Sequence, residues 1–310
     1  MATRPQNLGY DSELLILAFD HRGSFQKKMF GIAGAPTPEE TQKIASYKEI
    51  IFRGFEKALN SGRAPKEAAG VLFDEQFGTA IGAEAKQKGY LYAMPAEKSG
   101  QNEFDFEYGP EFGAHIEHFG PTFVKVLVRY NPEGDAEMNK RQAARLKELS
   151  DYCHSSSKSK YLFELLVPAE PHQLEKVGGD QKRYDQEVRP GLMIQAIQEL
   201  QAYGIEPDIW KIEGLDHLKD AQAVAEVCRR DGRDHVSCVV LGRGENDAKV
   251  EEWLRVGAQV PAFVGFAIGR SIFWEPLKGA LEGKYTREEA ADRVADTYAR
   301  FVKVWKDARG

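Results

Sequence analysis

Short runs rich in β-branched and aromatic residues recur along the chain, and amphipathic segments of helical periodicity separate them. They predict strands at residues 14–19, 70–73, 90–94, 123–128, 161–166, 208–212, 236–241 and 262–268. Eight strands that alternate with helices over about 250 to 300 residues are typical of a (β/α)8 TIM barrel. A doubly wound open sheet is the competing fold, but no Gly-x-Gly-x-x-Gly sequence follows the first run. We therefore predict a single barrel domain over residues 1–310.

Local signals mark where several of the intervening helices begin and end. The sequence Thr-Pro-Glu-Glu at residues 37–40 combines an N-cap threonine, a proline at the first helical position and a capping-box glutamate. A second capping box, Thr-Arg-Glu-Glu at residues 286–289, precedes the C-terminal amphipathic segment. A further helix is predicted to open at Arg189-Pro190 and to end at Gly204. No linker rich in Pro, Gly or Ser interrupts the alternation, which supports one domain.

Charge and composition exclude several classes of partner. A formal net charge of −6 at pH 7 argues against a general nucleic-acid binder, which usually carries a basic surface. No apolar stretch reaches the roughly 20 residues that a membrane helix needs, and the amino-terminal residues lack the apolar core of a signal peptide. The 3 cysteines are odd in number and lack metal-ligand spacing, which favours a reducing compartment. We expect a soluble cytoplasmic protein with no nucleic-acid or membrane partner.

Some of the predicted strands carry a charged residue in an otherwise apolar run. Lys211 lies in Pro-Asp-Ile-Trp-Lys-Ile-Glu, Lys125 in Phe-Val-Lys-Val-Leu-Val, and Glu164 in Leu-Phe-Glu-Leu-Leu-Val. Because the side chains of a strand alternate between its two faces, all of them can point into one interior. Loss of hydration there favours the neutral, nucleophilic form of a lysine amine. The set predicts amine chemistry on a carbonyl, although Lys125 and Glu164 alone could form a buried structural ion pair.

Polar and charged residues gather after the predicted strands, where a barrel has its active site. The first strand is followed by Asp20, and the third leads to Lys98. Glycines and arginines follow the last two strands, where this fold often binds phosphate; they are Gly242, Arg243, Gly244, Gly269 and Arg270. The histidines lack metal-ligand spacing, so we predict no metal site.

The order of the strand motifs also resembles that of a known enzyme family. The motifs extend from Phe19 to Trp274 and are FDHRGSF, VLFDEQFG, PAEKSGQ, FVKVLVRY, LFELLVP, DIWKIEGL, VVLGRG and AIGRSIFW. They are similar to the domain joined to a kinase in some bacterial inositol-catabolism proteins, a 2-deoxy-5-keto-gluconate 6-phosphate aldolase. More distantly they resemble the class I tagatose-bisphosphate and sulfofructose-phosphate aldolases. The resemblance covers nearly the whole chain.

The resemblance implies roles for individual residues. In those aldolases the lysine of the sixth strand forms the Schiff base, a position that falls on Lys211. The other matching positions are Asp20, Lys98, Lys125, Glu164 and the phosphate-binding arginine, Arg270. One departure is that tagatose-bisphosphate aldolases have a serine after strand seven, where this chain has Gly242-Arg243-Gly244. Their substrate therefore does not transfer directly to this chain.

Retro-aldol cleavage of a keto-sugar phosphate through an imine is the predicted reaction. Lys211 attacks the ketone, with burial and the nearby Lys125 cation favouring its neutral form, and Glu164 transfers protons. The resemblance implies 2-deoxy-5-keto-gluconate 6-phosphate as substrate, with dihydroxyacetone phosphate and malonate semialdehyde as products. The base for C–C cleavage is either Asp20 or Glu164. No cofactor is predicted, because the imine replaces the metal ion of the other aldolase class.

Other interpretations of the same residues stay open at this stage. The substrate could be another ketose phosphate, such as sulfofructose 1-phosphate or tagatose 1,6-bisphosphate. A non-catalytic sugar-phosphate-binding barrel would keep the arginines but would not need a buried lysine. A homo-oligomer is a further expectation, since Phe104, Phe106 and Tyr108 are predicted to be exposed and could line an interface or a lid.

Overall fold

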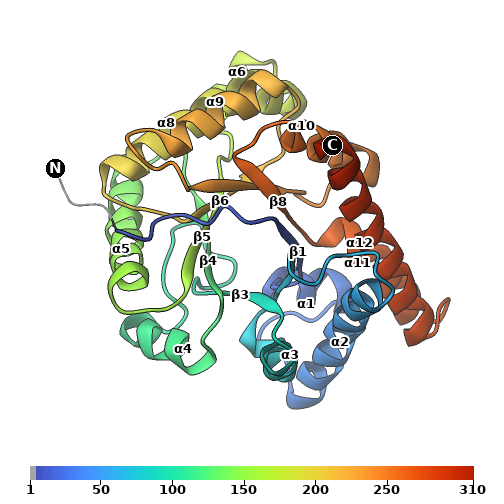
Figure 1. The fold of residues 1–310 in the computed structure, drawn as a ribbon. Coiled ribbons are helices and arrows are strands. Elements are labelled where there is room, and N and C mark those ends of the chain that lie inside the picture. Colours follow the sequence, from blue (N-terminus) through green and yellow to red (C-terminus); the bar gives the residue numbers. More distant parts are fainter. Residues whose placement is uncertain (1–4) are drawn as a thin grey trace.

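The computed structural model describes residues 5–310, and within this range eight parallel strands close into a barrel. Each strand pairs with its neighbour in chain order, and β1 pairs with β8 to complete the ring (Figure 1). The strands are β1 Leu14–Ala18, β2 Ala69–Leu72, β3 Leu91–Pro95, β4 Phe123–Arg129, β5 Lys160–Leu166, β6 Ile209–Glu213, β7 Ser237–Leu241 and β8 Phe263–Ile268. The predicted barrel is confirmed, and no predicted strand boundary differs from the observed one by more than one residue.

Helices follow the strands and form the outer layer of the barrel (Figure 1). Those after β1 to β4 are α1 Gly23–Phe30, α2 Pro38–Asn60, α3 Glu75–Lys88, α4 Phe112–Phe119 (preceded by the 3-10 turn Gly109–Glu111) and α5 Ala136–Ser155. Those after β5 to β8 are α6 Pro171–Lys176, α7 Gln181–Arg183, the π-helical turn Tyr184–Val188, α8 Arg189–Ala202, α9 Leu218–Arg229, α10 Asp247–Ala258, α11 Arg270–Leu281 and α12 Arg287–Arg309.

The predicted helix signals act as backbone caps. Oγ1 of Thr37 accepts a hydrogen bond from the backbone N–H of Glu40 at 3.2 Å, and Oε2 of Glu40 accepts from the N–H of Thr37 at 2.8 Å. Thr286 forms the same kind of capping box at the start of α12. These two capping boxes are confirmed. Helix α8 starts at Arg189 as predicted, but it continues directly from the π-helical turn Tyr184–Val188, and its C-cap is Tyr203 and not Gly204, whose φ is +76°.

The C-terminal helix α12 packs along α2 and joins the end of the chain to its beginning (Figure 1). Gly54 of α2 allows the close approach, because a Cβ atom at this position would lie 2.5 Å from the side chain of Val294. Tyr298 of α12 donates a hydrogen bond from its hydroxyl to the main-chain oxygen of Leu15 in β1 at 2.6 Å. Helix α12 therefore fixes the first strand as well as the first long helix.

Inward side chains of the strands form a compact apolar cluster, which we call the apolar plug. Its members are Leu14, Ile16, Ala18, Leu72, Ala93, Phe123, Leu162, Ile209, Val239, Val264 and Ala267. Tyr10, in the segment before β1, packs against this plug, with its ring 5.1 Å from that of Phe123 in an edge-on arrangement. The dark-blue segment that contains Tyr10 crosses the barrel in Figure 1. The plug thus fills the barrel interior with apolar side chains, and two of its members, Ala18 and Ala267, also line the cavity at the carboxyl end.

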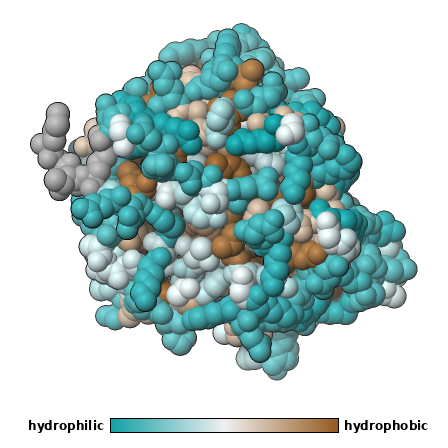
Figure 2. All heavy atoms as spheres, in the orientation of Figure 1, coloured by the Kyte–Doolittle hydropathy of each residue, from teal (hydrophilic) through white to brown (hydrophobic). Residues whose placement is uncertain are grey.

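Most residues on the face shown in Figure 2 are hydrophilic, with hydrophobic residues gathered near its centre. The prediction that Phe104 and Phe106 are exposed is wrong: both are buried, because they pack with Phe112, whose ring stacks on that of Phe106 at 4.1 Å. Tyr108 is 41% exposed, as predicted. Within residues 5–310 the structure has no helix with the length and apolar character needed to cross a membrane.

Candidate active site

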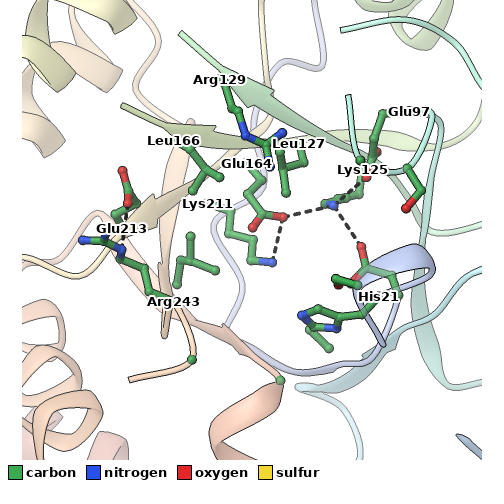
Figure 3. A pocket seen from close by; sticks show the side chains of 18 of the residues that line it. His21, Glu97, Lys125, Leu127, Arg129, Glu164, Leu166, Lys211, Glu213 and Arg243 are labelled. Carbon is green, nitrogen blue, oxygen red and sulfur yellow. Dashed lines mark hydrogen bonds and ion pairs between the residues drawn. The ribbon is translucent and has the colours of Figure 1, made fainter. Parts of the chain in front are cut away.

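Lys125, Glu164 and Lys211 lie together inside the carboxyl end of the barrel (Figure 3). They come from the neighbouring strands β4, β5 and β6, and the strand register places Glu164 directly opposite Lys211. All three are buried, with exposures of 2%, 5% and 3%. On each of these strands the residue two positions earlier belongs to the apolar plug. The alternation of strand faces therefore brings together the charged residues that the sequence predicts to converge.

One carboxylate oxygen contacts both lysines. Oε2 of Glu164 accepts a hydrogen bond from Nζ of Lys211 at 2.9 Å and lies 3.1 Å from Nζ of Lys125. Nζ of Lys125 also donates to Oδ2 of Asp20 at 2.9 Å and to Oε1 of Glu97 at 2.8 Å. Dashed lines in Figure 3 mark these contacts. We call the connected residues Asp20, Glu97, Lys125, Glu164 and Lys211 the charged layer.

The position of Glu164 bears on one prediction. The sequence predicts that the nearby Lys125 cation favours the neutral form of Lys211, and the structure places the Glu164 carboxylate in contact with both ammonium groups. A group within hydrogen-bond distance of an amine can exchange a proton with it. Glu164 is therefore the residue placed to exchange protons with Lys211 directly.

The residues of the charged layer shift one another's pKa. Burial would raise the pKa of Asp20 and of Glu164, but the nearby lysines, chiefly Lys125, outweigh burial and hold both values below their ordinary range. Burial would lower the pKa of Lys125, yet the surrounding carboxylates raise it above its ordinary value. For Glu97 burial prevails and the pKa is raised. These directions favour a Lys125 cation beside ionised Asp20 and Glu164 at pH 7.

The loop that carries Asp20 is held from outside the barrel by Lys48 of α2. The Lys48 ammonium is fully buried and donates to the main-chain oxygens of Phe19 at 2.8 Å and His21 at 2.9 Å, and it forms an ion pair with Asp74. Burial lowers the pKa of His21 to about 4, so its imidazole is neutral at pH 7. These contacts fix the backbone on both sides of Asp20.

The charged layer lines a cavity of about 610 Å³, a size that suits a small metabolite. Every residue predicted from the sequence as a site residue lines this cavity; they are Asp20, Lys98, Lys125, Glu164, Lys211, Gly242, Arg243, Gly244, Gly269 and Arg270. Lys98 lies at a more exposed part of the wall, where its Nζ donates to Oδ2 of Asp105 at 2.8 Å. The structure thus brings the predicted residues to one place, and their roles stay predictions.

Arg243 and Arg270, which follow β7 and β8, differ in whether carboxylates pair with their charge. Nε of Arg243 lies 3.1 Å from Oε1 of Glu213, and its Nη1 donates to Oδ2 of Asp185 at 2.7 Å (Figure 3 shows the Glu213 contact). Nη2 of Arg270 donates to the main-chain oxygen of Arg243 at 2.7 Å. Within residues 5–310 no carboxylate lies within ion-pair distance of Arg270. The sequence predicts that both arginines add charge to an anion site, but carboxylates offset the charge of Arg243.

Gly244 makes the position of Arg270 possible. A Cβ atom on Gly244 would lie 2.7 Å from Cζ and 2.8 Å from Nε of Arg270, closer than real contacts of this kind. The φ of Gly244 is +79°, a conformation that favours glycine, and the preceding Arg243 has a φ of +51°. Any side chain at position 244 would displace the Arg270 guanidinium.

Arg129, Glu97 and Glu213 line the cavity but are absent from the sequence-predicted site (Figure 3). Arg129 ends β4 and shares the inward face with Lys125, because their positions in the strand differ by an even number. The predicted strand stops at residue 128, one residue short of Arg129. Glu213 follows Lys211 by two residues, so the alternation of strand faces also predicts that Glu213 points into the barrel. Nη1 of Arg129 donates to the main-chain oxygen of Gln101 at 2.7 Å.

The acidic residues of the charged layer point toward a nitrogen atom. Asp20, Glu97 and Glu164 all contact Nζ of Lys125. Within the part of the chain that the structure describes, there is no group of three or more His, Cys, Asp or Glu residues arranged to hold a metal ion. The ammonium group of Lys125 occupies the centre on which these carboxylates converge.

The fold and the cavity define a (β/α)8-barrel protein with a buried lysine–carboxylate site at the carboxyl ends of its strands. The chain belongs to the family described as "Uncharacterized protein conserved in bacteria (DUF2090)", whose model matches residues 2–309.

More distant similarities connect the chain to aldolases. It is 26% identical over 163 residues to tagatose 1,6-diphosphate aldolase 2 of Streptococcus pyogenes serotype M1, and equally to that of serotype M18. The match covers 51% of this chain and 46% of the relative, so it spans about half the length of these curated relatives. A solved fructose-bisphosphate aldolase of Plasmodium falciparum, in complex with TRAP and an inhibitor, superposes with a TM-score of 0.62. It covers 95% of this chain and 91% of that chain at 15% identity, which shows the fold alone.

Proposed function

We propose that this protein is a class I aldolase, which cleaves a keto-sugar phosphate through a Schiff base on Lys211. The observation that carries the proposal is the 2.9 Å contact between Nζ of Lys211 and Oε2 of Glu164, inside a cavity lined by further charged residues. A buried lysine beside a carboxylate is the arrangement that imine formation needs. The 26% identity to tagatose 1,6-diphosphate aldolases supports the same reaction class.

Imine formation begins when Lys211 transfers a proton to Glu164 and attacks the ketone carbon of the substrate. After the attack, a second proton moves from the nitrogen to the oxygen and gives the neutral carbinolamine. The proton that Glu164 holds then goes to the carbinolamine hydroxyl, which leaves as water. The product is an iminium ion, in which nitrogen carries the positive charge. Glu164 suits both transfers because it contacts the lysine nitrogen directly.

Cleavage follows from the pull of the iminium ion on the neighbouring C–C bond. Asp20 takes the proton of the hydroxyl on the carbon β to the imine, and the bond between the α and β carbons breaks. Its electrons pass to the iminium nitrogen and leave an enamine on Lys211, while the aldehyde product departs. A proton then adds to the α carbon, and water hydrolyses the imine to release the ketone. The nearby lysines hold the pKa of Asp20 below its ordinary range, which keeps the carboxylate ionised and therefore able to accept a proton at pH 7.

The charges on two walls of the cavity support a substrate with an anionic group at each end. Arg270 follows β8 and Arg129 ends β4, and strands 4 and 8 lie opposite each other in an eight-stranded ring. Lys211, on β6, lies between these walls. We propose 2-deoxy-5-keto-gluconate 6-phosphate, which has a phosphate and a carboxylate, as substrate. Its products are dihydroxyacetone phosphate and malonate semialdehyde.

Borohydride trapping tests the mechanism. The protein is incubated with dihydroxyacetone phosphate and borohydride, digested, and analysed by mass spectrometry. We expect the mass of the reduced adduct on the peptide that contains Lys211. Lys160→Met removes a lysine from the amino-terminal end of β5 and should leave this adduct in place, whereas Lys211→Met should abolish it. An adduct on a different lysine, or none, would contradict the proposal; binding without any adduct would indicate a non-catalytic barrel.

A comparison of kcat/KM tests the substrate. The candidates are 2-deoxy-5-keto-gluconate 6-phosphate, sulfofructose 1-phosphate and tagatose 1,6-bisphosphate. We expect the first to have the highest value. A higher value for either of the others would keep the imine mechanism and replace the substrate.

A further inference from the structure

Glu97 is the carboxyl group of the charged layer that the mechanism above does not use. It follows β3, it is 8% exposed, and its main-chain oxygen accepts a hydrogen bond from Nη2 of Arg22. Its Oε1 accepts from Lys125 at 2.8 Å, which is shorter than the contacts of Lys125 with Asp20 at 2.9 Å and Glu164 at 3.1 Å. Its other oxygen, Oε2, is buried and has no hydrogen-bond partner within residues 5–310. Glu97 is thus firmly held, with one oxygen on the Lys125 ammonium and one unpartnered.

The charges of this layer do not balance if every carboxyl group is ionised. Asp20, Glu97 and Glu164 would then carry three negative charges against at most two positive charges on Lys125 and Lys211. An unpaired buried charge is costly, and one retained proton removes it. The unpartnered Oε2 indicates that Glu97 is the residue that keeps this proton. A buried neutral hydroxyl without a hydrogen-bond partner costs less free energy than a buried charged oxygen without one. The raised pKa of Glu97 agrees, since the pKa values of Asp20 and Glu164 are lowered.

We propose that Glu97 is a positioning residue that carries a proton in the working enzyme. As a neutral acid it holds the Lys125 ammonium through Oε1 without cancelling its charge. The charge of Lys125 then acts on Asp20 and Glu164 and keeps both ionised as bases. The catalytic meaning of this inference rests on the proposed function, whereas the protonation state of Glu97 does not.

Groups from several elements surround the Glu97 carboxyl group: Lys125 of β4, Asp20 and Arg22 after β1, and Tyr161 of β5. Lys125 and Arg22 favour ionisation of Glu97, while burial and Asp20 oppose it. Arg22 lies 3.8 Å from Oε1 of Glu97, but its Nη1 donates to Glu107 at 3.1 Å, which offsets its charge. The hydroxyl of Tyr161 is buried without a hydrogen-bond partner among the described residues. Both cations near Glu97 are therefore shared, since Lys125 also contacts Asp20 and Glu164, and Arg22 also contacts Glu107.

Infrared spectroscopy tests the protonation state without any assay of activity. At pH 7 the wild-type protein should show the carbonyl absorption of a protonated carboxyl group, with the expected shift in heavy water. Glu97→Gln should lack this absorption. Glu251→Gln, which removes an ion-paired carboxylate from the surface of α10, is the control and should keep it. A wild-type spectrum without the absorption, or a Glu97→Gln spectrum that retains it, would overturn the proposal.

Two substitutions of Glu97 separate its hydrogen bond from its charge. Leucine cannot accept a hydrogen bond from Lys125, so we expect Glu97→Leu to lower kcat about 10- to 100-fold. Glutamine is neutral and keeps the acceptor oxygen, so Glu97→Gln should be about tenfold faster than Glu97→Leu. The pH profile gives a readout that lost packing would not change. The wild-type rate should decline at alkaline pH as Glu97 loses its proton, and this decline should be absent in Glu97→Gln.

Equal loss of rate in both variants would show that the site uses an ionised Glu97, and the proposal would be wrong. It would also be wrong if Glu97→Leu were as fast as the wild type, or if Glu97→Gln kept the alkaline decline. These results are distinct from failure of the proposed function. That failure appears as a missing adduct on Lys211 in the wild-type protein, and it leaves the infrared result intact.

Discussion

Two layers of side chains share the interior of the barrel, and the same strands build both. On β5, Leu162 belongs to the apolar plug, whereas Glu164, two residues or roughly 7 Å further along the strand, belongs to the charged layer. Strands β4 and β6 make the same change from apolar to charged over two residues. Members of both layers are buried except Asp20, which is partly buried.

The comparison shows that burial stabilises the protein at an apolar side chain and costs free energy at a charged side chain two residues further along the same strand. A fully buried leucine side chain contributes about 1.5–3 kcal/mol to stability. Buried charges instead lose hydration that costs several kcal/mol per ion, which their ion pairs recover only in part. The plug therefore stabilises a barrel in which the charged layer can be built. Substitutions in the plug should change stability, and substitutions in the charged layer should change activity or the dependence of stability on pH.

Lys211→Met should have the largest effect, because it removes the proposed nucleophile. We expect kcat to fall at least about 10⁴-fold, while the melting temperature changes by only a few degrees, since Glu164 keeps Lys125 as its partner. The release of dihydroxyacetone phosphate and thermal unfolding are measured on the same sample. Ile209→Val, in the plug on the same strand, is the matched control and should unfold earlier while it retains its rate. A Lys211→Met rate within tenfold of the wild type would contradict the comparison.

Lys125→Met should lower the free energy of unfolding by about 3–5 kcal/mol at pH 7, because Asp20 and Glu164 lose their shared cation. In the wild type their lowered pKa values add stability that is complete above their ordinary pKa of about 4 and is lost as pH falls below it. In the variant the same buried carboxyls gain by taking up protons. Lowering the pH to about 5 should therefore recover part of the deficit, as measured by urea unfolding. A deficit that is independent of pH would point to lost packing instead.

Leu162→Ala should lower the free energy of unfolding by about 3 kcal/mol, through lost apolar contact and the cavity that remains. Because no titratable group is removed, the loss should be the same at pH 5 and at pH 7. Urea unfolding at the two pH values checks this against Lys125→Met. The rate per folded molecule should stay close to that of the wild type. A tenfold loss of rate would mean that the two layers are not separable.

Arg129→Gln should have the smallest effect, because the charge that it removes lies at the wall of the cavity and is partly exposed. We expect KM for a substrate with two anionic ends to rise about tenfold, which corresponds to about 1.4 kcal/mol. The melting temperature should not change. Fructose 1-phosphate, with one anionic group, is the control substrate, and its ratio of KM values should stay near one. Equal increases for both substrates would argue against a second anion site at Arg129.

The sequence predicts the strands well because most of them are short runs rich in apolar residues between amphipathic segments. The inward position of Lys125, Glu164 and Lys211 follows from the two-residue period of a strand. Burial of Phe104 and Phe106 was not predictable, because it depends on Phe112 of α4, which the sequence alone does not place beside them.

Pairings between distant loops are also invisible in the sequence. Arg243 is bound by Asp185, which lies 58 residues away in the π-helical turn before α8. The position of that turn depends on the conformation of the whole segment between β5 and α8. From the sequence, the charge of Arg243 is therefore expected to be free to bind an anion. In the structure, a carboxylate offsets it. Arg129 was missed for a simpler reason, since it lies one residue beyond the predicted end of its strand.

The contact between Gly244 and Arg270 matters for anyone who wants to redesign this cavity. The Arg270 guanidinium occupies the space that a Cβ atom at position 244 would need, so a side chain at 244 and the arginine at its present place exclude each other. A library that varies the loop after β7 alone would lose Arg270 from its place in nearly every member. Positions 244 and 270 should therefore be varied together when a new anion specificity is sought.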